Sequence, residues 1–406
     1  MNASATRHPL VFRVVPALNS HPPVLVTARL PSFARGPADA TNRLGGKAVA
    51  VLGAGSVGGV AIADLARMNL RRLLVVDRKR FKPESVATHQ VGPDAIGEWK
   101  AEHAARRAAA LSPGTEVTFC CEDFRKLSLD VFAGFDYLVL ATDNGEAELA
   151  AGALARRLGI ALVQGAVEGA TLQAQVRCFG NGSAAAPCPG CFLGRAEWSA
   201  VGQGTAFACD GSTTPLGDEP PTRSVAPLCS LAGDLIALAV LRDVLGLGPG
   251  VRDTMLSYSA YTHESVVIPL RLAPDCPCDH RPARRVVLAG QLAAHSLERI
   301  LAAAALAPAA VNFRIDGLRF CERAACPACG AASRPRRFIA PGAGVPCRCG
   351  QTAKPVRYYT HEDVAPEHVG AARLSAALAK LGAADARIVS LAAPGEFVLA
   401  IGEKHA

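Results

Sequence analysis

The chain has 406 residues, half of them apolar and 19% charged, which argues against a long disordered chain and leaves room for two or three domains. Its formal net charge is +8, but the basic residues are scattered and aromatic residues make up only 5%, so we expect no nucleic-acid partner. No apolar stretch is long enough to span a bilayer and the first residues do not resemble a signal peptide, so we expect a cytoplasmic protein without a membrane partner.

The first two thirds of the sequence alternate between strand and helix patterns. Residues 1–45 are proline-rich and are expected to form an N-terminal arm, with β-like runs at 11–15 and 24–30. Buried strands are predicted at 47–52, 72–76, 116–121, 137–141 and 161–164, and helices at 60–68, 98–111 and 144–158. An antiparallel strand at 172–179, a helix at 230–245 and a strand pair ending near residue 272 follow. The pattern predicts an α/β domain over residues 46–284, with a mostly parallel sheet of the Rossmann type.

The composition changes near residue 285, where a smaller α+β module is expected to begin and to run to residue 406. Its predicted helices are 292–307 and 366–381, and its predicted strands are 311–315, 387–392 and 396–401. Between them, residues 321–352 carry two close cysteine pairs, which are Cys326 with Cys329 and Cys347 with Cys349. Such pairs in a segment rich in glycine, proline and arginine predict a zinc-ribbon-like insert, and we expect it to serve as a docking surface.

A glycine-rich turn follows the first predicted strand of the α/β domain. Gly53, Gly55 and Gly58 form the pattern G-x-G-x-x-G, with Ser56 and Val57 between the last two glycines, directly before a predicted helix. The first glycine allows a tight turn, the second allows backbone amides to approach a phosphate, and the third allows close packing of helix on strand. Asp77 ends the next predicted strand, where it can accept hydrogen bonds from ribose hydroxyls. The turn predicts a nucleotide site without choosing between NAD, FAD and ATP.

Several further motifs in the same order along the chain resemble those of the ThiF/MoeB/HesA family, the bacterial relatives of ubiquitin-activating enzymes. The resemblance runs from about residue 43 to residue 280 and rests on these segments: residues 75–90, with Ser85, His89 and Gln90; residues 96–101, with Lys100; residues 111–117; Thr142, Asp143 and Asn144; residues 165–176; and the pairs Cys188 with Cys191 and Cys276 with Cys278. The sequence departs from the family at Val86 and His89, which occupy the positions of an Asn and an Arg that contact phosphates in the family.

The resemblance implies that the domain adenylates a carboxylate with ATP and Mg²⁺. Lys100 would supply positive charge to the phosphates, and Asp143 would hold the magnesium ion. The other residues implied to bind the nucleotide, besides the glycine turn and Asp77, are Lys79, Ser85, His89, Gln90 and Asn144. Lys79 and its neighbours Arg78 and Arg80 could compensate for the missing arginine. A dehydrogenase is the weakest reading of the glycine turn, because the Lys100 and Asp143 segments would then be coincidental.

The resemblance also implies a structural zinc ion. Cys188, Cys191, Cys276 and Cys278 would supply four thiolates, and such a closed site is structural, not catalytic. The second pair is one residue shorter than the usual C-x-x-C spacing, which strains chelation by both sulfurs, so His280 is an alternative ligand.

Family members that pass their product onward use a cysteine thiolate, which is a strong nucleophile. Two cysteines are candidates here: Cys209, in a Gly/Ser/Thr-rich stretch that we expect to be a mobile loop, and Cys229, which we expect at the start of the helix after that stretch. Neither matches the family's position residue for residue, so a chain without a catalytic thiol stays open.

The leading functional hypothesis is activation of a ubiquitin-like protein that ends in glycine, followed by transfer to a conjugating-enzyme-like partner. The alternatives are a sulfur-carrier or small-acid adenylyltransferase and a non-catalytic scaffold that binds a partner. A homodimer is also possible. The family's N-terminal arginine, which reaches a dimer partner's site, is not recognisable here, and Arg35 and Arg43 are the nearest candidates.

Overall fold

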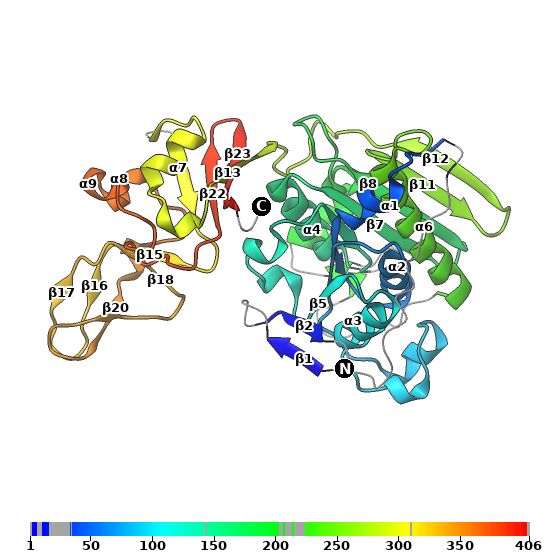
Figure 1. The fold of residues 1–406 in the computed structure, drawn as a ribbon, viewed down its shortest axis with the longest axis horizontal. Helices are drawn as coiled ribbons and strands as arrows, with labels where there is room; N and C mark the ends of the chain where they lie inside the picture. Colours follow the sequence, from blue (N-terminus) through cyan, green and yellow to red (C-terminus); the bar gives the residue numbers. More distant parts are fainter. Residues whose placement is uncertain are drawn as a thin grey trace. The chain divides into compact units, whose positions relative to one another are not determined.

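The computed structural model describes residues 2–5, 10–15, 33, 35–142, 144–202, 206–207, 213–214, 224–308 and 311–403. The chain divides into two compact units (Figure 1). The first unit consists of residues 1–127, 135–156 and 160–280, and the second of residues 128–134, 157–159 and 281–406. Among the helices described in these ranges, none combines the length and the apolar character needed to cross a membrane.

The first unit is built on a ten-stranded sheet with the order β1-β2-β5-β4-β3-β6-β7-β8-β11-β12. Its strands are β1 (Asn2–Ala5), β2 (Phe12–Val15), β3 (Ala48–Leu52), β4 (Arg72–Val76), β5 (Glu116–Cys120), β6 (Tyr137–Leu140), β7 (Ala161–Glu168), β8 (Gln173–Phe179), β11 (Thr254–Ser259) and β12 (Glu264–Pro269). The five central strands, from β5 to β7, are parallel, as the alternating pattern predicts. Antiparallel strands extend the sheet on both sides of this centre.

Helices accompany the crossovers between the parallel strands (Figure 1). The helices of this unit are α1 (Ala40–Gly45), α2 (Ser56–Arg67), α3 (Lys100–Leu111), α4 (Gly145–Leu158), α5 (Arg195–Gly202) and α6 (Ala226–Leu245). Helix α2 packs against both α3 and α6, and α6 also contacts β7 and β8. All five residues of β3 are completely buried, so the strand that leads into the glycine turn lies in the middle of the core.

The strand order reverses at β3, because β4 lies on one side of it and β6 on the other. In parallel α/β sheets a ligand crevice forms outside the carboxyl ends of the strands at such a reversal. The loops that follow β3, β4, β5 and β6 all lie at this edge. The fold therefore brings together the glycine turn, the segment after Asp77 and the segment after β6.

The second unit contains a four-stranded sheet and two smaller sheets. The four-stranded sheet has the order β13 (Ala283–Leu288), β23 (Glu396–Gly402), β22 (Ile388–Ala393) and β14 (Asn312–Arg314), with helix α7 (Leu297–Ala303) beside it. The smaller sheets are formed by β15 (Arg319–Cys321), β18 (Arg337–Ile339) and β21 (Thr360–His361), and by β16 (Ala324–Ala325), β17 (Ala332–Ser333), β19 (Val345–Pro346) and β20 (Thr352–Pro355). The strands predicted at 387–392 and 396–401 are confirmed as β22 and β23.

Four predicted helices differ clearly from the observed ones, and one of them, α6, begins at Ala226, four residues earlier than expected. Helix α2 begins at Ser56, four residues earlier than expected, because the tight turn ends at Gly55. The helix expected at 292–307 is a short 3-10 turn followed by α7, which starts where the Ser296 hydroxyl accepts a hydrogen bond from the Arg299 amide. The helix expected at 366–381 is broken at Gly370, whose φ of 85° ends α8 (Pro366–Val369) before α9 (Ala371–Leu374).

The proline-rich N-terminal region is described only in part. The β-like run at 11–15 forms β2, which pairs with β5 and with the unpredicted strand β1. The run expected at 24–30 lies outside the described residues.

Candidate nucleotide site and metal centres

The glycine turn has the geometry that close backbone approach requires. Gly53 has a φ of 101°, and a Cβ there would lie 2.6 Å from the Ala141 carbonyl oxygen. A Cβ on Gly58 would lie 2.1 Å from the Gly53 carbonyl oxygen, so this position closes the turn by direct contact. At Gly55 the nearest atom to a Cβ would be His89 Nε2 at 3.8 Å, so this glycine faces open space. The turn thus presents its amides at the start of α2, where the helix dipole favours an anion.

A cavity of about 200 Å³ opens at this edge of the sheet. It is lined by residues from the carboxyl ends of the central strands: Gly53, Gly55, Ser56 and Val57 after β3; Val76, Asp77, Arg78 and Lys79 after β4; His89 and Lys100; Glu122, Asp123, Phe124 and Arg125 after β5; Ala141, Thr142, Asn144 and Ala147 after β6; and Gly165, Ala166 and Val167 of β7. The lining includes four cationic side chains, those of Arg78, Lys79, Lys100 and Arg125. A ligand with phosphate groups suits such a cavity.

Asp77 fixes the turn at the mouth of the cavity. Its Oδ2 accepts a hydrogen bond from the Ala54 amide at 2.8 Å, and its Oδ1 accepts one from the Lys79 amide at 2.7 Å. Each carboxylate oxygen has a second lone pair, so the side chain can still accept a hydrogen bond from a ligand hydroxyl. Asp77 therefore connects the ends of β3 and β4.

Lys100 and His89 line the cavity and contact each other. The Lys100 Nζ lies 3.1 Å from His89 Nε2, and Thr88 Oγ1 lies 3.1 Å from His89 Nδ1. Burial and the nearby Lys100 charge lower the pKa of His89 to about 4. The imidazole is therefore neutral near pH 7, and Nε2 accepts from Lys100 while Nδ1–H donates to Thr88. The sequence predicts both residues as ligands of the nucleotide but not this contact between them.

The wall opposite contains residues that the sequence analysis missed. Arg125 contacts both oxygens of Asp123 at 2.6–3.1 Å and donates a further hydrogen bond to Glu146 at 3.0 Å. Burial disfavours the charged form of Asp123, but the hydrogen bonds from Arg125 outweigh it and lower its pKa. These residues directly follow β5, so the rule that ligands bind at the carboxyl ends of parallel strands could have pointed to them.

Other residues predicted from the family resemblance lie elsewhere. Ser85 is buried, and its Oγ accepts from the Lys82 amide, so it orders the loop that carries His89 without lining the cavity. Gln90 lies behind the cavity and donates to Ser230 Oγ at 3.1 Å. Asn144 lines the cavity, but its Oδ1 accepts from two amides of the first turn of α4 and so caps that helix.

Two candidate catalytic residues, Asp143 and Cys209, lie outside the described residues. The third, Cys229, belongs to the first turns of α6, which begins at Ala226, four residues before the expected start. Its side chain is completely buried within the apolar core, and its sulfur contacts Ser224 Oγ at 3.2 Å. Cys229 thus lies near the helix start as expected, but a completely buried thiol is not placed to attack a substrate.

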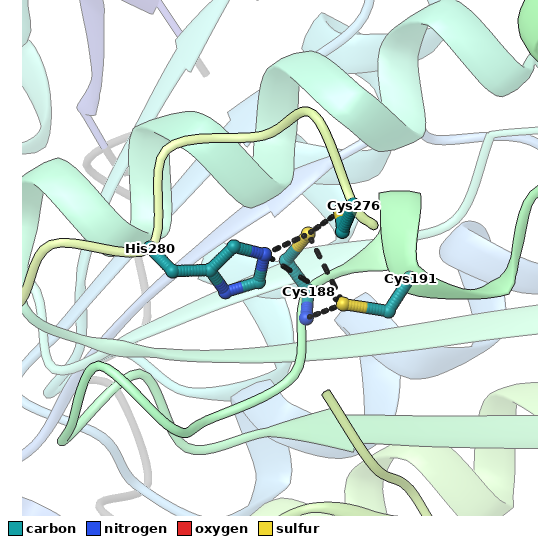
Figure 2. A group of neighbouring side chains, drawn as sticks. All are labelled: Cys188, Cys191, Cys276 and His280. Carbon is teal, nitrogen blue, oxygen red and sulfur yellow. Dashed lines mark hydrogen bonds between the residues drawn. The ribbon is translucent and has the colours of Figure 1, made fainter. Parts of the chain in front are cut away.

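Four ligand atoms in the first unit converge on one point. Cys188 Sγ lies 3.9 Å from Cys191 Sγ, 3.8 Å from Cys276 Sγ and 3.5 Å from His280 Nε2 (Figure 2). All four ligand atoms lie within 4.8 Å of one another. His280, which the sequence analysis named as the alternative ligand, is in this group in place of Cys278. The Cys278 sulfur lies close to Gly190, where it would be 2.6 Å from an added Cβ.

Arg156 of α4 holds the segments that carry these ligands. Its side chain is 2% exposed and donates hydrogen bonds to four carbonyls, those of Ser183, Ala186, Pro187 and His280, at 2.9–3.2 Å. The Ala186 carbonyl also accepts from His280 Nδ1 at 3.1 Å, which leaves Nε2 free to face the sulfurs. A buried arginine thus ties the loop before Cys188 to the loop that ends at His280, a contact that sequence spacing does not reveal.

The second unit holds another group of four cysteines. Cys326 and Cys329 lie at the tip of the β16–β17 hairpin, and Cys347 and Cys349 at the tip of the β19–β20 hairpin. The sulfurs of Cys326 and Cys349 are 3.6 Å apart, as are those of Cys329 and Cys347, and all four lie within 4.8 Å of one another. Gly330 and Gly350 follow the two pairs with φ of 71° and 82°, so each hairpin turns through the left-handed region that glycine allows.

Both groups fit a tetrahedral zinc ion. With Zn–S bonds of about 2.3 Å, the sulfurs of a tetrahedral site lie about 3.8 Å apart. The sulfur–sulfur separations of 3.6–3.9 Å in the two groups match this edge. All positions are filled by protein ligands, so a metal at either group would tie two chain segments together and leave no open coordination site for a substrate.

The sequence matches the ThiF family over residues 28–278. The SAMP-activating enzyme E1 of Haloferax volcanii is 30% identical over 238 residues, covering 58% of this chain and 81% of that protein. The sulfur carrier protein adenylyltransferase of Thermus thermophilus is 25% identical over 257 residues, covering 60% of this chain and 86% of that protein. A crystal structure of E. coli MccB with ATP aligns with 13% identity and a TM-score of 0.46, over 59% of this chain and 68% of that chain, a likeness too low to inform the site. Since the family match covers more than half of its length, the chain belongs to the ThiF family.

Proposed function

We propose that the first unit is an ATP-dependent adenylyltransferase that activates the C-terminal carboxylate of a small ubiquitin-like protein. The observation that carries the proposal is the convergence of the glycine turn, Asp77 and Lys100 on one cavity in a chain of the ThiF family. The names of the relatives in Haloferax and Thermus, which activate SAMP and a sulfur carrier protein, support a small protein as the substrate.

The chemistry needs little from the protein beyond position and charge. A carboxylate oxygen of the substrate attacks the α-phosphorus of ATP, the new O–P bond forms, and the bond to the β-phosphate oxygen breaks, so pyrophosphate leaves with the electron pair. No proton has to be transferred. The amides of the glycine turn would bind the phosphates, Lys100 would stabilise the negative charge that develops, and Asp77 would accept from the ribose. A bound Mg²⁺ would add charge neutralisation, and Asp143 stays the predicted ligand.

The direct test is ATP–pyrophosphate exchange with and without an added ubiquitin-like protein that ends in glycine. We expect exchange only with the carrier. We also expect Lys100→Met to lower the exchange rate about 100-fold or more, because it removes one fixed charge from the transition state. Lys380→Met is a matched control, because Lys380 is an exposed lysine of the second unit that does not line the cavity. Exchange with a free small acid and no carrier would favour the small-acid alternative, and no ATP binding at all would favour the scaffold.

The transfer step after adenylation is a further part of the proposal. Cys209 would attack the acyl-adenylate carbonyl, forming a thioester and releasing AMP, and the acyl group would then pass to a conjugating-enzyme-like partner. Burial of Cys229 favours Cys209 between the two candidates. Mass spectrometry of the carrier-loaded enzyme tests this: Cys209→Ala should abolish the thioester and keep exchange, whereas Cys229→Ala should keep both. Exchange without any thioester in the unmodified chain would favour a sulfur-carrier adenylyltransferase.

A further inference from the structure

The positive charge of this chain is concentrated in one small part of the second unit. Residues 319–359, which we call the ribbon, contain eight arginine or lysine residues and a single acidic residue, Glu322. The ribbon therefore carries a formal charge of +7, against +8 for the whole chain. Four thiolates around one Zn²⁺ would bring −2, so the ribbon would stay strongly positive with its metal bound.

Most of these cations are exposed and form no ion pair with the part of the chain that the structure describes. Five of them are exposed and have no ion pair among the described residues, namely Arg334, Arg337, Arg348, Lys354 and Arg357. Arg319 differs, because it pairs with Glu362 at 2.7 Å. A surface with so many cations and so few acidic partners has a positive potential, which a bound polyanion would neutralise.

The rest of the ribbon surface favours a nucleic acid over an acidic protein as the binding partner. Among all residues of the ribbon, Tyr358 is the only large hydrophobic side chain that is exposed, at 88%. Protein–protein interfaces are built around an apolar centre, which the ribbon does not offer. Interfaces with nucleic acids are more polar and far more positive, and exposed tyrosines stack on unpaired bases. Tyr358 follows Arg357 directly, so a stacking group and a phosphate-binding group lie side by side.

The metal group gives the ribbon a fixed shape for such a role. The ribbon has only a small core, formed mainly by Cys321, Ala324, Cys326, Ile339, Val345 and Ala353. Its two hairpins meet at the four cysteines, so a bound zinc ion would hold the arginine-bearing loops in place. From the charge, the exposure and the lack of an apolar centre, we propose that the ribbon is a binding surface for single-stranded nucleic acid.

This inference is independent of the proposed adenylation and revises one expectation from the sequence. From the sequence we expect no nucleic-acid partner because the basic residues are scattered over the whole chain, but this expectation leaves out the balance of charge within residues 319–359. Strand pairs with partners up to 41 residues apart fold this segment into small sheets.

Fluorescence anisotropy of the full-length, zinc-loaded protein with a labelled 20-nucleotide single-stranded RNA tests the proposal. We expect the triple substitution Arg334→Gln, Arg348→Gln and Arg357→Gln to weaken binding at least about tenfold and to reduce the slope of log K against log salt by about 2, because three phosphate contacts are lost. The matched control, with the same change in charge, is Arg67→Gln, Arg106→Gln and Arg299→Gln, which should bind like the unmodified protein. Zinc content and ATP–pyrophosphate exchange should be unchanged in both variants.

The variant Tyr358→Ala tests whether the tyrosine ring stacks on a base, an effect that charge alone would not produce. It should weaken binding of single-stranded RNA more than binding of a duplex of the same length, because a duplex keeps its bases stacked on one another. Equal binding by the triple variant and its matched control would overturn the proposal. So would equally tight binding of polyglutamate and RNA by the unmodified protein, a result that would point to an acidic protein as the partner.

Discussion

Lys100 Nζ donates to His89 Nε2 over 3.1 Å at the edge of the candidate nucleotide site. The neutral imidazole of His89 carries its proton on one nitrogen only. It can accept from Lys100 at Nε2 only while that proton is on Nδ1, which then donates to Thr88. His89 therefore positions the lysine while it stays neutral, and it stands where the family carries an arginine. At this position the chain therefore has a titratable base where the family resemblance leads us to expect a fixed cation.

Nucleotide binding should accordingly take up a proton. Burial and the Lys100 charge lower the pKa of His89 to about 4 in the free protein, and phosphates bound nearby would raise it again. Near pH 5 to 6 we expect ATP binding to be coupled to uptake of a fraction of a proton, and near pH 8 to almost none. Calorimetry in two buffers of different ionisation enthalpy measures this difference. His89→Asn should abolish the coupling, and identical binding enthalpies at pH 5.5 in both buffers would contradict the idea.

The lowered pKa of His89 also makes the free energy of unfolding depend on pH. Because the folded-state pKa of His89 lies below the unfolded value of about 6.5, the unfolded state binds more protons in the interval between the two values. This contribution is fully present above about pH 6.5 and is lost as the pH falls toward 4. Urea denaturation at pH 7.5 and pH 5 should show a smaller loss of stability for His89→Asn than for the unmodified protein. An equal loss in both proteins would mean that groups other than His89 determine the loss of stability at low pH.

Two neighbouring glycines of α2 should respond in opposite ways to alanine. A Cβ on Gly58 would lie 2.1 Å from the Gly53 carbonyl oxygen, so Gly58→Ala must open the turn, and we expect loss of ATP binding and destabilisation by about 2 kcal/mol or more. A Cβ on Gly59 would meet nothing within 4 Å, so Gly59→Ala should stabilise the helix by up to about 1 kcal/mol and keep ATP binding. Thermal denaturation and calorimetric titration with ATP measure both effects. A Gly58→Ala protein that binds ATP normally would show that the turn has room to adjust.

The sequence predicts those parts of the site that depend on local chain geometry. Gly53, Gly58 and Asp77 are recognisable because a strand, a turn and a helix follow one another within a few residues. The pairing of Arg125 with Asp123 and Glu146 is not recognisable in the sequence. It joins the segment after β5 to the start of α4, and only the strand order brings these two segments together. The fold shows the same division. The parallel arrangement of the five central strands follows from the alternating pattern of strands and helices. The antiparallel strand β1 has no sequence signal strong enough to predict it.

The metal groups also show which contacts the sequence can predict and which it cannot. The pairs Cys326 with Cys329 and Cys347 with Cys349 are close in sequence and meet as expected. In the first unit the sequence could not choose between Cys278 and His280, because both lie in one short loop and either can reach Cys188. A non-local contact bears on this loop, because Arg156 donates a hydrogen bond to the His280 carbonyl from a helix more than 100 residues away in sequence.

Arg156 should therefore stabilise the metal group of the first unit without touching the metal. Arg156→Met removes hydrogen bonds to four carbonyls, and we expect it to lower the free energy of unfolding by about 3 kcal/mol and to speed zinc release to a chelator about 10- to 100-fold. The adjacent Arg157→Met is a suitable control, because Arg157 is partly exposed and makes only a 3.6 Å ion pair with Asp316. Absorbance of a chromophoric chelator follows the release. Equal release rates in both variants would assign Arg156 a purely local role.

The identity of the ligands can be tested by counting zinc. We expect two zinc ions per chain in the purified protein, one at each group. Because His280 Nε2 faces Cys188 and Cys191 at 3.5 and 3.7 Å, His280→Ala should lower the count to about one and leave the ribbon metal in place. Cys278→Ser should keep both ions, since Cys278 is not in the group, and Cys349→Ser should lose only the ion of the second unit. Elemental analysis after removal of loosely bound metal gives the counts; a Cys278→Ser protein with one ion and a His280→Ala protein with two would reverse the assignment and make the site a tetrathiolate.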